Sequence, residues 1–138
     1  MKKMPKWSLG SRADINVEGF RVVAQQLMDR FGLKMVGSHL RISRSASDNG
    51  WLTVVYDGEN FVRSTQYDIH IVDRVGGGDA FAGGLIYSLL TGKNIKEAAE
   101  FGAAASCLKQ TIHGDFNHVS VKEVESLAQG DASGRVKR

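Results

Sequence analysis

The sequence contains a single cysteine, Cys107, so no disulfide can form within the chain. This cysteine lies among small and apolar residues, which favours a buried side chain over a reactive thiol. No apolar run approaches the roughly 20 residues that a membrane-spanning helix needs, and nothing after the basic N-terminus resembles the core of a signal peptide. We therefore expect a cytoplasmic protein without a membrane partner.

Metal and nucleic-acid binding have little support in the sequence. No two of the histidines have the spacing of a helical His-Glu-x-x-His metal site, so we assign no metal ligand among His39, His70, His113 and His118. The net charge of +3 arises in part from lysines and arginines at the two ends of the chain. These cations are scattered and lack interleaved aromatic residues, so we interpret both ends as solvated and expect no nucleic-acid partner.

The length and composition indicate one globular domain. The chain has 138 residues, of which 42% are hydrophobic and 24% are charged. We interpret residues 1–15 as an irregular lead-in, residues 16–130 as the folded unit and residues 131–138 as a basic tail. There is no internal repeat and no interdomain linker.

Hydrophobic periodicity predicts helices mixed with strands, and hence an α/β fold. Helices are expected at residues 17–30, with Asp14 or Asn16 as the N-cap, at 80–90, at 95–108, with Asn94 and Glu97 as a cap, and from Ser120 onwards. Strands are expected around residues 34–40, 51–56, 60–63 and 67–72. A hairpin turn is expected at 57–60 and a polar loop at 41–50.

The stretch most suggestive of chemistry is residues 73–84, which join a strand-like run to a helix-like run. Gly76, Gly77 and Gly78 lack Cβ atoms, so the backbone can turn sharply and bring bare N–H groups close to an anion. A helix that begins there would direct its positive dipole end to the same place. Asp79 would compete with that anion, which suggests catalysis rather than simple binding.

Two common phosphate-binding patterns do not fit this stretch. The dinucleotide pattern Gly-x-Gly-x-x-Gly fails because its third glycine position falls on Phe81. The P-loop pattern fails because no lysine lies between Asp73 and Gly84. Two interpretations remain. Either Asp79 only caps a helix, or it accepts the proton of an attacking hydroxyl while the glycine N–H groups hold the γ-phosphate of a nucleotide.

At this stretch the chain resembles the PfkB, or ribokinase-like, family of carbohydrate kinases. The family signature has the form Asp-Thr-x-Gly-Ala-Gly-Asp-x-Phe, and the positions that fit it are Asp73, Val75, Gly76, Gly78, Asp79 and Phe81. Arg74 stands in place of the threonine and Gly77 in place of the alanine. Residues 41–51, 69–79 and 111–117 are similar to the 2-dehydro-3-deoxygluconokinases within this family.

The resemblance implies a fold, a reaction and a set of site residues. The fold would be the C-terminal part of a ribokinase-like domain, with a partial central sheet flanked by helices. The reaction would be phosphorylation of 2-keto-3-deoxygluconate by ATP, with Mg²⁺, at its terminal hydroxyl. By this resemblance Asp79 is the catalytic base and contacts the substrate, and Asp115 lies near the sugar. The anion hole would comprise Gly76, Gly77 and Gly78, and the nucleotide would lie near Arg41, Ser43, Ser45, Ala46 and Ala103.

The resemblance covers only the C-terminal part of a family member. The other part supplies most of the sheet, the sugar-binding residues, a lid and the Asn-x-x-Glu motif that organises Mg²⁺. Asn94 and Glu97 have that spacing but follow the signature, so we interpret them as a helix cap. The alternatives are another ribokinase-like activity, such as that of a fructokinase or ribokinase, and a catalytically silent fragment that binds nucleotide or forms a homo-oligomer.

Overall fold

The computed structural model describes residues 16–130, so the predicted lead-in and basic tail lie outside the described residues. Eight elements follow one another: α1 (Val17–Phe31), β1 (Val36–Ser43), β2 (Asp48–Tyr56), β3 (Phe61–Arg63), β4 (Tyr67–His70), α2 (Gly77–Leu90), α3 (Ile95–Gln110) and α4 (Val121–Gln129). Within this part of the chain, no helix has the length and apolarity needed to cross a membrane.

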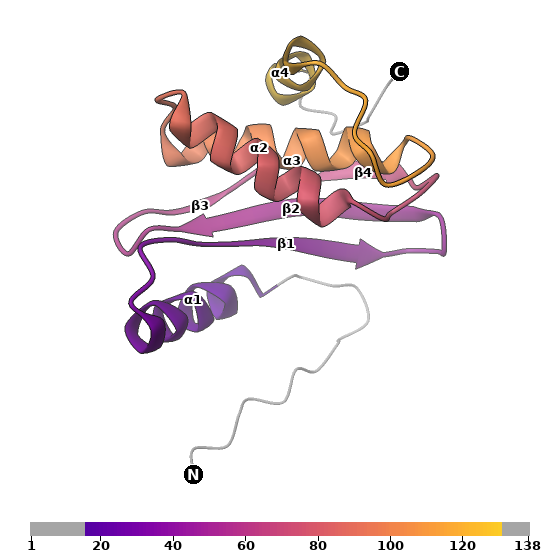
Figure 1. The fold of residues 1–138 in the computed structure, drawn as a ribbon. Coiled ribbons are helices and arrows are strands. Elements are labelled where there is room, and N and C mark those ends of the chain that lie inside the picture. Colours follow the sequence, from indigo (N-terminus) through magenta and orange to yellow (C-terminus); the bar gives the residue numbers. More distant parts are fainter. Residues whose placement is uncertain (1–15, 131–138) are drawn as a thin grey trace.

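A four-stranded antiparallel sheet lies between helices on its two faces (Figure 1). β2 is the central strand. β1 pairs with it along one edge, while β3 and β4 pair with opposite ends of its other edge. α1 lies against one face, α2 and α3 cover the other, and α4 packs on α3. The predicted α/β class is therefore confirmed.

Helix ends follow the local sequence signals. The Asn16 side chain caps α1 and Gly32 ends it with a left-handed φ of 64°. Asn94 caps α3, and the Glu97 side chain accepts a hydrogen bond from the Asn94 backbone amide in return. This capping box confirms that Asn94 and Glu97 form a helix cap, and Ser120 begins α4 in the same way.

The predicted polar loop at residues 41–50 is wrong. Its first residues continue β1 and its last residues begin β2, which leaves only a short turn at 44–47. Arg41 pairs with Trp51, and Ser43 with Asn49, in the antiparallel ladder. The side chains of Arg41 and Ser43 are exposed, so their polarity reflects the edge of a sheet rather than a loop. Conversely, β4 ends at residue 70 rather than 72.

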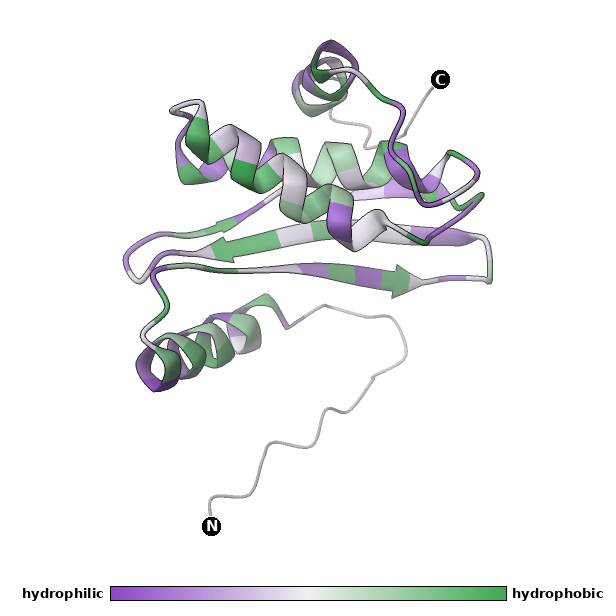
Figure 2. Ribbon diagram, in the orientation of Figure 1, coloured by the Kyte–Doolittle hydropathy of each residue, from purple (hydrophilic) through white to green (hydrophobic). Residues whose placement is uncertain are grey.

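The contact between α2 and α3 depends on two glycines. A Cβ placed on Gly84 would lie 3.0 Å from the Cα of Gly102, and one placed on Gly102 would lie 2.9 Å from the Phe81 ring. Phe81 is buried and packs with Val55 and Ala99 between the helices and the sheet. Figure 2 shows hydrophobic residues along much of β2, α2 and α3. The small residues of α3 thus permit close packing against α2.

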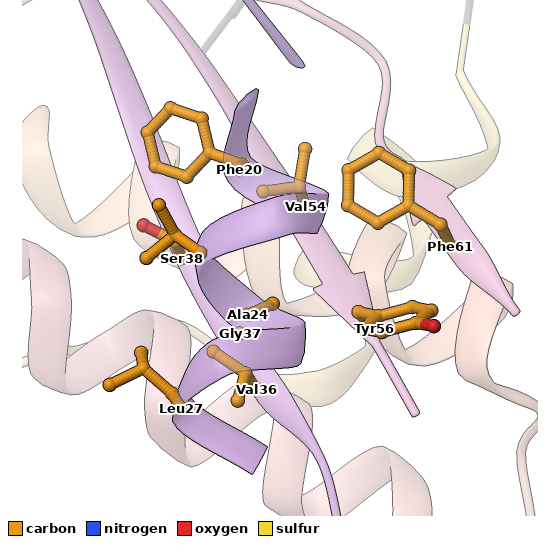
Figure 3. Close-up of a pocket in the computed structure, with 10 residues that line it drawn as sticks. Phe20, Ala24, Leu27, Val36, Gly37, Ser38, Val54, Tyr56 and Phe61 are labelled. Carbon is orange, nitrogen blue, oxygen red and sulfur yellow. The ribbon is translucent and has the colours of Figure 1, made fainter. Parts of the chain in front are cut away.

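α1 is held on the opposite face by a separate apolar contact (Figure 3). A pocket of about 170 Å³ separates the helix from the sheet, and its walls include Phe20, Leu27, Val54 and Phe61. Ala24 is the one buried residue of α1. This helix therefore covers the sheet more loosely than α3 does.

Adjacent glycines in α2 offer a matched test of the packing. Gly84→Ala should destabilise the fold by about 1 to 3 kcal/mol because its Cβ would press against the backbone of α3. Gly83→Ala meets no atom within 4 Å, so it should be neutral or stabilise the helix by up to about 1 kcal/mol. Urea unfolding of both variants measures the difference, and equal midpoints would contradict the assigned contact.

Candidate active site

α2 begins inside the glycine run, as the sequence predicts. Gly76 is its N-cap and has a φ of 84°, a left-handed conformation that favours glycine. A Cβ at this position would lie 2.3 Å from the backbone oxygen of Asp115. The glycine loop, residues 73–79, therefore packs directly against the loop that follows α3, and both its conformation and its contacts require glycine at position 76.

The backbone amides of the glycine loop are not equivalent. The Gly77 amide donates to the Arg74 carbonyl at 3.1 Å, so it is already used inside the loop. Within residues 16–130, the amides of Gly76, Gly78 and Asp79 have no hydrogen-bond acceptor. The place of Gly77 in the expected anion hole stays a prediction, and in this conformation its amide donates within the loop. Three free amides nevertheless remain at the N-terminus of α2.

Asp79 lies in the first turn of α2 and is exposed. Its side chain does not cap the helix, because Gly76 is the N-cap and no side-chain hydrogen bond is made there. In the described part of the chain the Asp79 carboxylate has no hydrogen-bond or ion-pair partner. The interpretation of Asp79 as only a helix cap therefore lacks its defining interaction.

The C-terminal end of α3 holds the start of the glycine loop. The Gln110 carbonyl accepts hydrogen bonds from the amides of Val72 and Asp73, at 2.9 and 3.2 Å. The Ser106 hydroxyl donates to the Gly77 carbonyl at 2.7 Å. Ser106 and Gln110 are buried, so α3 positions both ends of the loop from the protein core.

The Asp73 carboxylate joins the glycine loop to the loop that follows α3. Its Oδ1 accepts from the Val75 amide and its Oδ2 from the Gly114 amide, each at 3.0 Å. These backbone hydrogen bonds favour the ionised form and lower the pKa of Asp73, with smaller contributions from the charges of Lys109 and His113. The first residue of the signature is thus a structural link between two loops.

A pocket of about 360 Å³ opens beside the glycine loop, and it is lined by His39, Arg41, Trp51, Arg74, Gly78 and Gln110. The His39 ring stacks on Trp51 with 4.7 Å between the ring centroids. Although part of His39 remains exposed, desolvation of its ring lowers its pKa. Two arginine side chains and a free amide therefore border one pocket, a setting that favours an anionic ligand.

Four of the expected site positions come together here. Arg41 and Gly78 line the same pocket. The Ala46 carbonyl accepts from the Arg74 guanidinium at 3.0 Å, which holds the turn at 44–47 beside the glycine loop. Asp115 belongs to the loop packed on Gly76.

Three other expected site residues do not line this pocket. The Ser45 hydroxyl accepts from the amides of Ser47 and Asp48, which closes the turn between β1 and β2. Ser43 is an exposed residue of β1 and is not part of the pocket wall. Ala103 is completely buried in a core cluster with Trp51 and Tyr67. The structure therefore does not bring Ala103 to the pocket.

The sequence reasoning missed three residues of this site: Arg74, Lys109 and Gln110. Arg74 stands in the signature in place of threonine, and the positive charge that this replacement brings to the loop is the signal that could have assigned it to the site. Lys109 and Gln110 could have been noticed as a polar pair that ends an alanine-rich helix. Lys109 is completely buried, and its Nζ donates to the Asp73 carbonyl at 3.1 Å.

The described residues do not form a protein cage for a metal ion. Among residues 16–130, no three His, Cys, Asp or Glu side chains gather in a way that could hold one. A magnesium ion commonly relies on one or two carboxylates together with substrate phosphates. We therefore assign no step of the chemistry to a metal held by this part of the chain.

Comparison with known proteins identifies the family. The profile of the pfkB family of carbohydrate kinases matches residues 38–120, which include most of β1, the glycine loop and α3. The chain belongs to this family. The resemblance inferred from the signature is thereby confirmed.

Three relatives illustrate the likeness. The crystal structure of a 2-dehydro-3-deoxygluconokinase from Thermotoga maritima is 48% identical with a TM-score of 0.79, and the match covers 82% of this chain and 35% of that one. A 2-dehydro-3-deoxygalactonokinase from Haloferax volcanii is 38% identical over 49% of this chain and 21% of its own. A 5-dehydro-2-deoxygluconokinase from Halalkalibacterium halodurans is 30% identical over 50% of this chain and 21% of its own. The chain thus spans between a fifth and about a third of these proteins.

Two substitutions can distinguish the energetic effect of the tight contact at Gly76 from the effect of its left-handed backbone conformation. Gly76→Ala should cost about 3 kcal/mol or more, because it adds both left-handed strain and a clash with the Asp115 backbone. Gly92 has a similar φ of 85° but no atom within 4 Å, so Gly92→Ala should cost only the strain, about 1 to 2 kcal/mol. Equal losses in chemical denaturation would show that the loop contact is unimportant.

The link through Asp73 should make stability depend on pH. A lowered pKa in the folded state means that the stabilisation is complete above the ordinary aspartate range, about pH 4, and is lost as the pH falls through the lowered value. Asp73→Asn should therefore have a lower free energy of unfolding than the natural protein at pH 7. The difference in free energy between the two proteins should become smaller below about pH 4. Urea unfolding at several pH values measures this difference in free energy of unfolding. A difference that does not change with pH would contradict the link through the ionised Asp73 carboxylate.

Proposed function

We propose that this chain carries the catalytic corner of an ATP-dependent kinase that phosphorylates 2-keto-3-deoxygluconate at its terminal hydroxyl. The observation that carries the proposal is the exposed, unpartnered carboxylate of Asp79 beside the free amides of Gly76 and Gly78 at the start of α2. An anion-binding helix terminus and an available base lie within the same turn. Phosphoryl transfer to a hydroxyl uses groups that position the phosphate and stabilise its charge, together with a residue that accepts the hydroxyl proton.

The chemistry divides between the loop and the carboxylate. The free amides of Gly76, Gly78 and Asp79 would bind oxygens of the γ-phosphate and stabilise the charge that develops during transfer. The Asp79 carboxylate would accept the proton of the sugar hydroxyl as that oxygen attacks phosphorus. General-base catalysis of this kind is typically worth roughly 10²- to 10⁴-fold in rate.

The pocket beside the loop supports an anionic substrate. Arg41 and Arg74 line it together with the Gly78 backbone, so a sugar acid or the phosphates of ATP would meet positive charge there. Asp115, in the loop packed on Gly76, would lie near the sugar. The turn that carries Ser45 and Ala46 would lie along the nucleotide, and Ser43 would extend that contact from β1.

The names of the relatives support the class of sugar. All three are named as kinases of keto-deoxy sugar acids or keto-deoxy sugars, and the Thermotoga protein is named for 2-dehydro-3-deoxygluconate itself. Family membership also implies ATP and a divalent metal. The adenine contact expected at Ala103 would require a change in packing, because that side chain is completely buried.

A second candidate function is nucleotide binding without turnover. It is favoured by the short length of the match, which extends over only 35% of the Thermotoga chain. Within the described residues the glycine loop is present, whereas most of the Thermotoga chain has no counterpart in the match. A third candidate is phosphorylation of fructose or ribose, because the same partial coverage leaves the choice of sugar open.

A substrate comparison distinguishes these candidates. We would measure ATP binding and ATP-dependent phosphorylation of 2-keto-3-deoxygluconate, fructose and ribose by the full chain. Turnover of the first sugar alone supports the proposal, whereas turnover of another sugar identifies a different kinase. ATP binding without turnover supports the silent fragment, and the absence of both would mean that the glycine loop has no kinase role in this chain.

Replacement of Asp79 tests the base directly. Asp79→Asn keeps the size of the side chain but removes the negative charge that accepts the proton, so turnover should fall roughly 10²- to 10⁴-fold. The fold should remain intact, because the carboxylate has no partner in the described structure. Asp29→Asn, on the opposite face of the sheet, is the matched control. Near-normal turnover by a folded Asp79→Asn variant would refute the assignment.

A further inference from the structure

Lys109 is an unusual residue for the interior of a small domain. It is 0% exposed and is the largest completely buried side chain in the described structure. Its Nζ donates to the backbone carbonyls of Asp73 at 3.1 Å and Ile112 at 3.4 Å. Within residues 16–130, no carboxylate oxygen lies within salt-bridge distance of this ammonium group. A buried charge of this kind is costly unless the surroundings compensate it.

The surroundings of Lys109 supply that compensation without an ion pair. The residue lies in the last turn of α3, where the negative end of the helix dipole favours a cation. Two carbonyl oxygens accept its protons, and the Asp73 carboxylate is close enough for the charge of Lys109 to help lower its pKa. The ammonium group is therefore held mainly by carbonyl dipoles.

The side chain of Lys109 runs directly beneath the glycine loop. A Cβ placed on Gly76 would lie 3.3 Å from the Cε of Lys109, so the two residues are in close contact. The neighbouring Gln110 carbonyl accepts from the Asp73 amide, while Lys109 donates to the Asp73 carbonyl. The end of α3 thus satisfies both backbone groups of the residue that opens the loop.

We propose that Lys109 is the internal cation of the glycine loop, a positioning residue that holds residues 73–78 against the loop at 111–115 and adds positive charge beneath the free amides. The second part of this role rests on the proposed function, in which those amides bind a phosphate. The first part concerns only this chain's own loops. An apolar side chain of the same length would fill the space but leave the two carbonyls without their donor.

The first experiment measures loop anchoring without any ligand. In Lys109→Ala, hydrogen exchange of the hydrogen-bonded amides at positions 72, 73, 75, 77, 112 and 114 should become at least about tenfold faster, because charged hydrogen bonds at both loops are lost. Exchange in β1 and β2 should be unchanged. Lys109→Met, which preserves volume, should show the same local effect if the alanine variant proves too unstable to study. Lys122→Ala, an exposed lysine on α4, is the matched control.

Chemical rescue distinguishes a cation from a packing group. Ammonium ions can occupy the space left in Lys109→Ala and donate to the same carbonyls, so ammonium chloride should restore slow exchange at both loops. Tetramethylammonium chloride at equal ionic strength has no N–H donor and should not. Lys109→Met should not respond to either salt because its side chain occupies the site.

The second experiment measures ATP binding under the same conditions. Lys109→Ala should bind ATP at least about tenfold more weakly, and ammonium should restore the affinity. Unchanged loop exchange in both variants would overturn the proposal. Faster exchange throughout the chain without rescue by ammonium would also overturn it, because Lys109 would then be only a packing residue. If the natural chain binds no ATP but the loops respond as expected, Lys109 is confirmed as an anchor and the proposed kinase function fails.

Discussion

The site depends on the contact between the C-terminal end of α3 and the chain that enters the glycine loop. The Gln110 carbonyl accepts hydrogen bonds from two consecutive amides of that segment. The hydroxyl of Ser106, which is also in α3, donates to the Gly77 carbonyl. Residues 101–110 of α3 are all buried between α2, α4 and the sheet. The position of the loop is therefore set by the core, and any change that moves α3 also moves the free amides.

This arrangement explains how the loop can present free amides without losing its shape. Inside the loop, Gly77 donates to Arg74, and the Asp73 carboxylate accepts the Val75 amide. The polar groups that shape the turn are thus paired with one another or with α3. Those that remain, at the first turn of α2, are free to bind an anion.

Local patterns predicted much of the fold because the interactions that form caps and hairpins lie close together in the sequence. Asn94 and Glu97 contact each other within one helical turn, and Asp57 organises its turn through amides two and three residues away. The boundary of β1 could not be predicted in the same way. Arg41 and Ser43 belong to a strand because β2 pairs with their backbone, and side-chain polarity does not report that pairing.

The sequence by itself determined the family, the order of helices and strands, and the position of the glycine run with Asp79 at the start of a helix. Each of these depends on residue identity or on near neighbours in the chain. Only the tertiary structure decided that the Gly77 amide is used, that Ala103 is in the core, and that Lys109 lies under the loop. The physical reason is that burial and hydrogen-bond partners are set by segments far apart in the chain, such as Lys109 and Asp73, which are 36 residues apart.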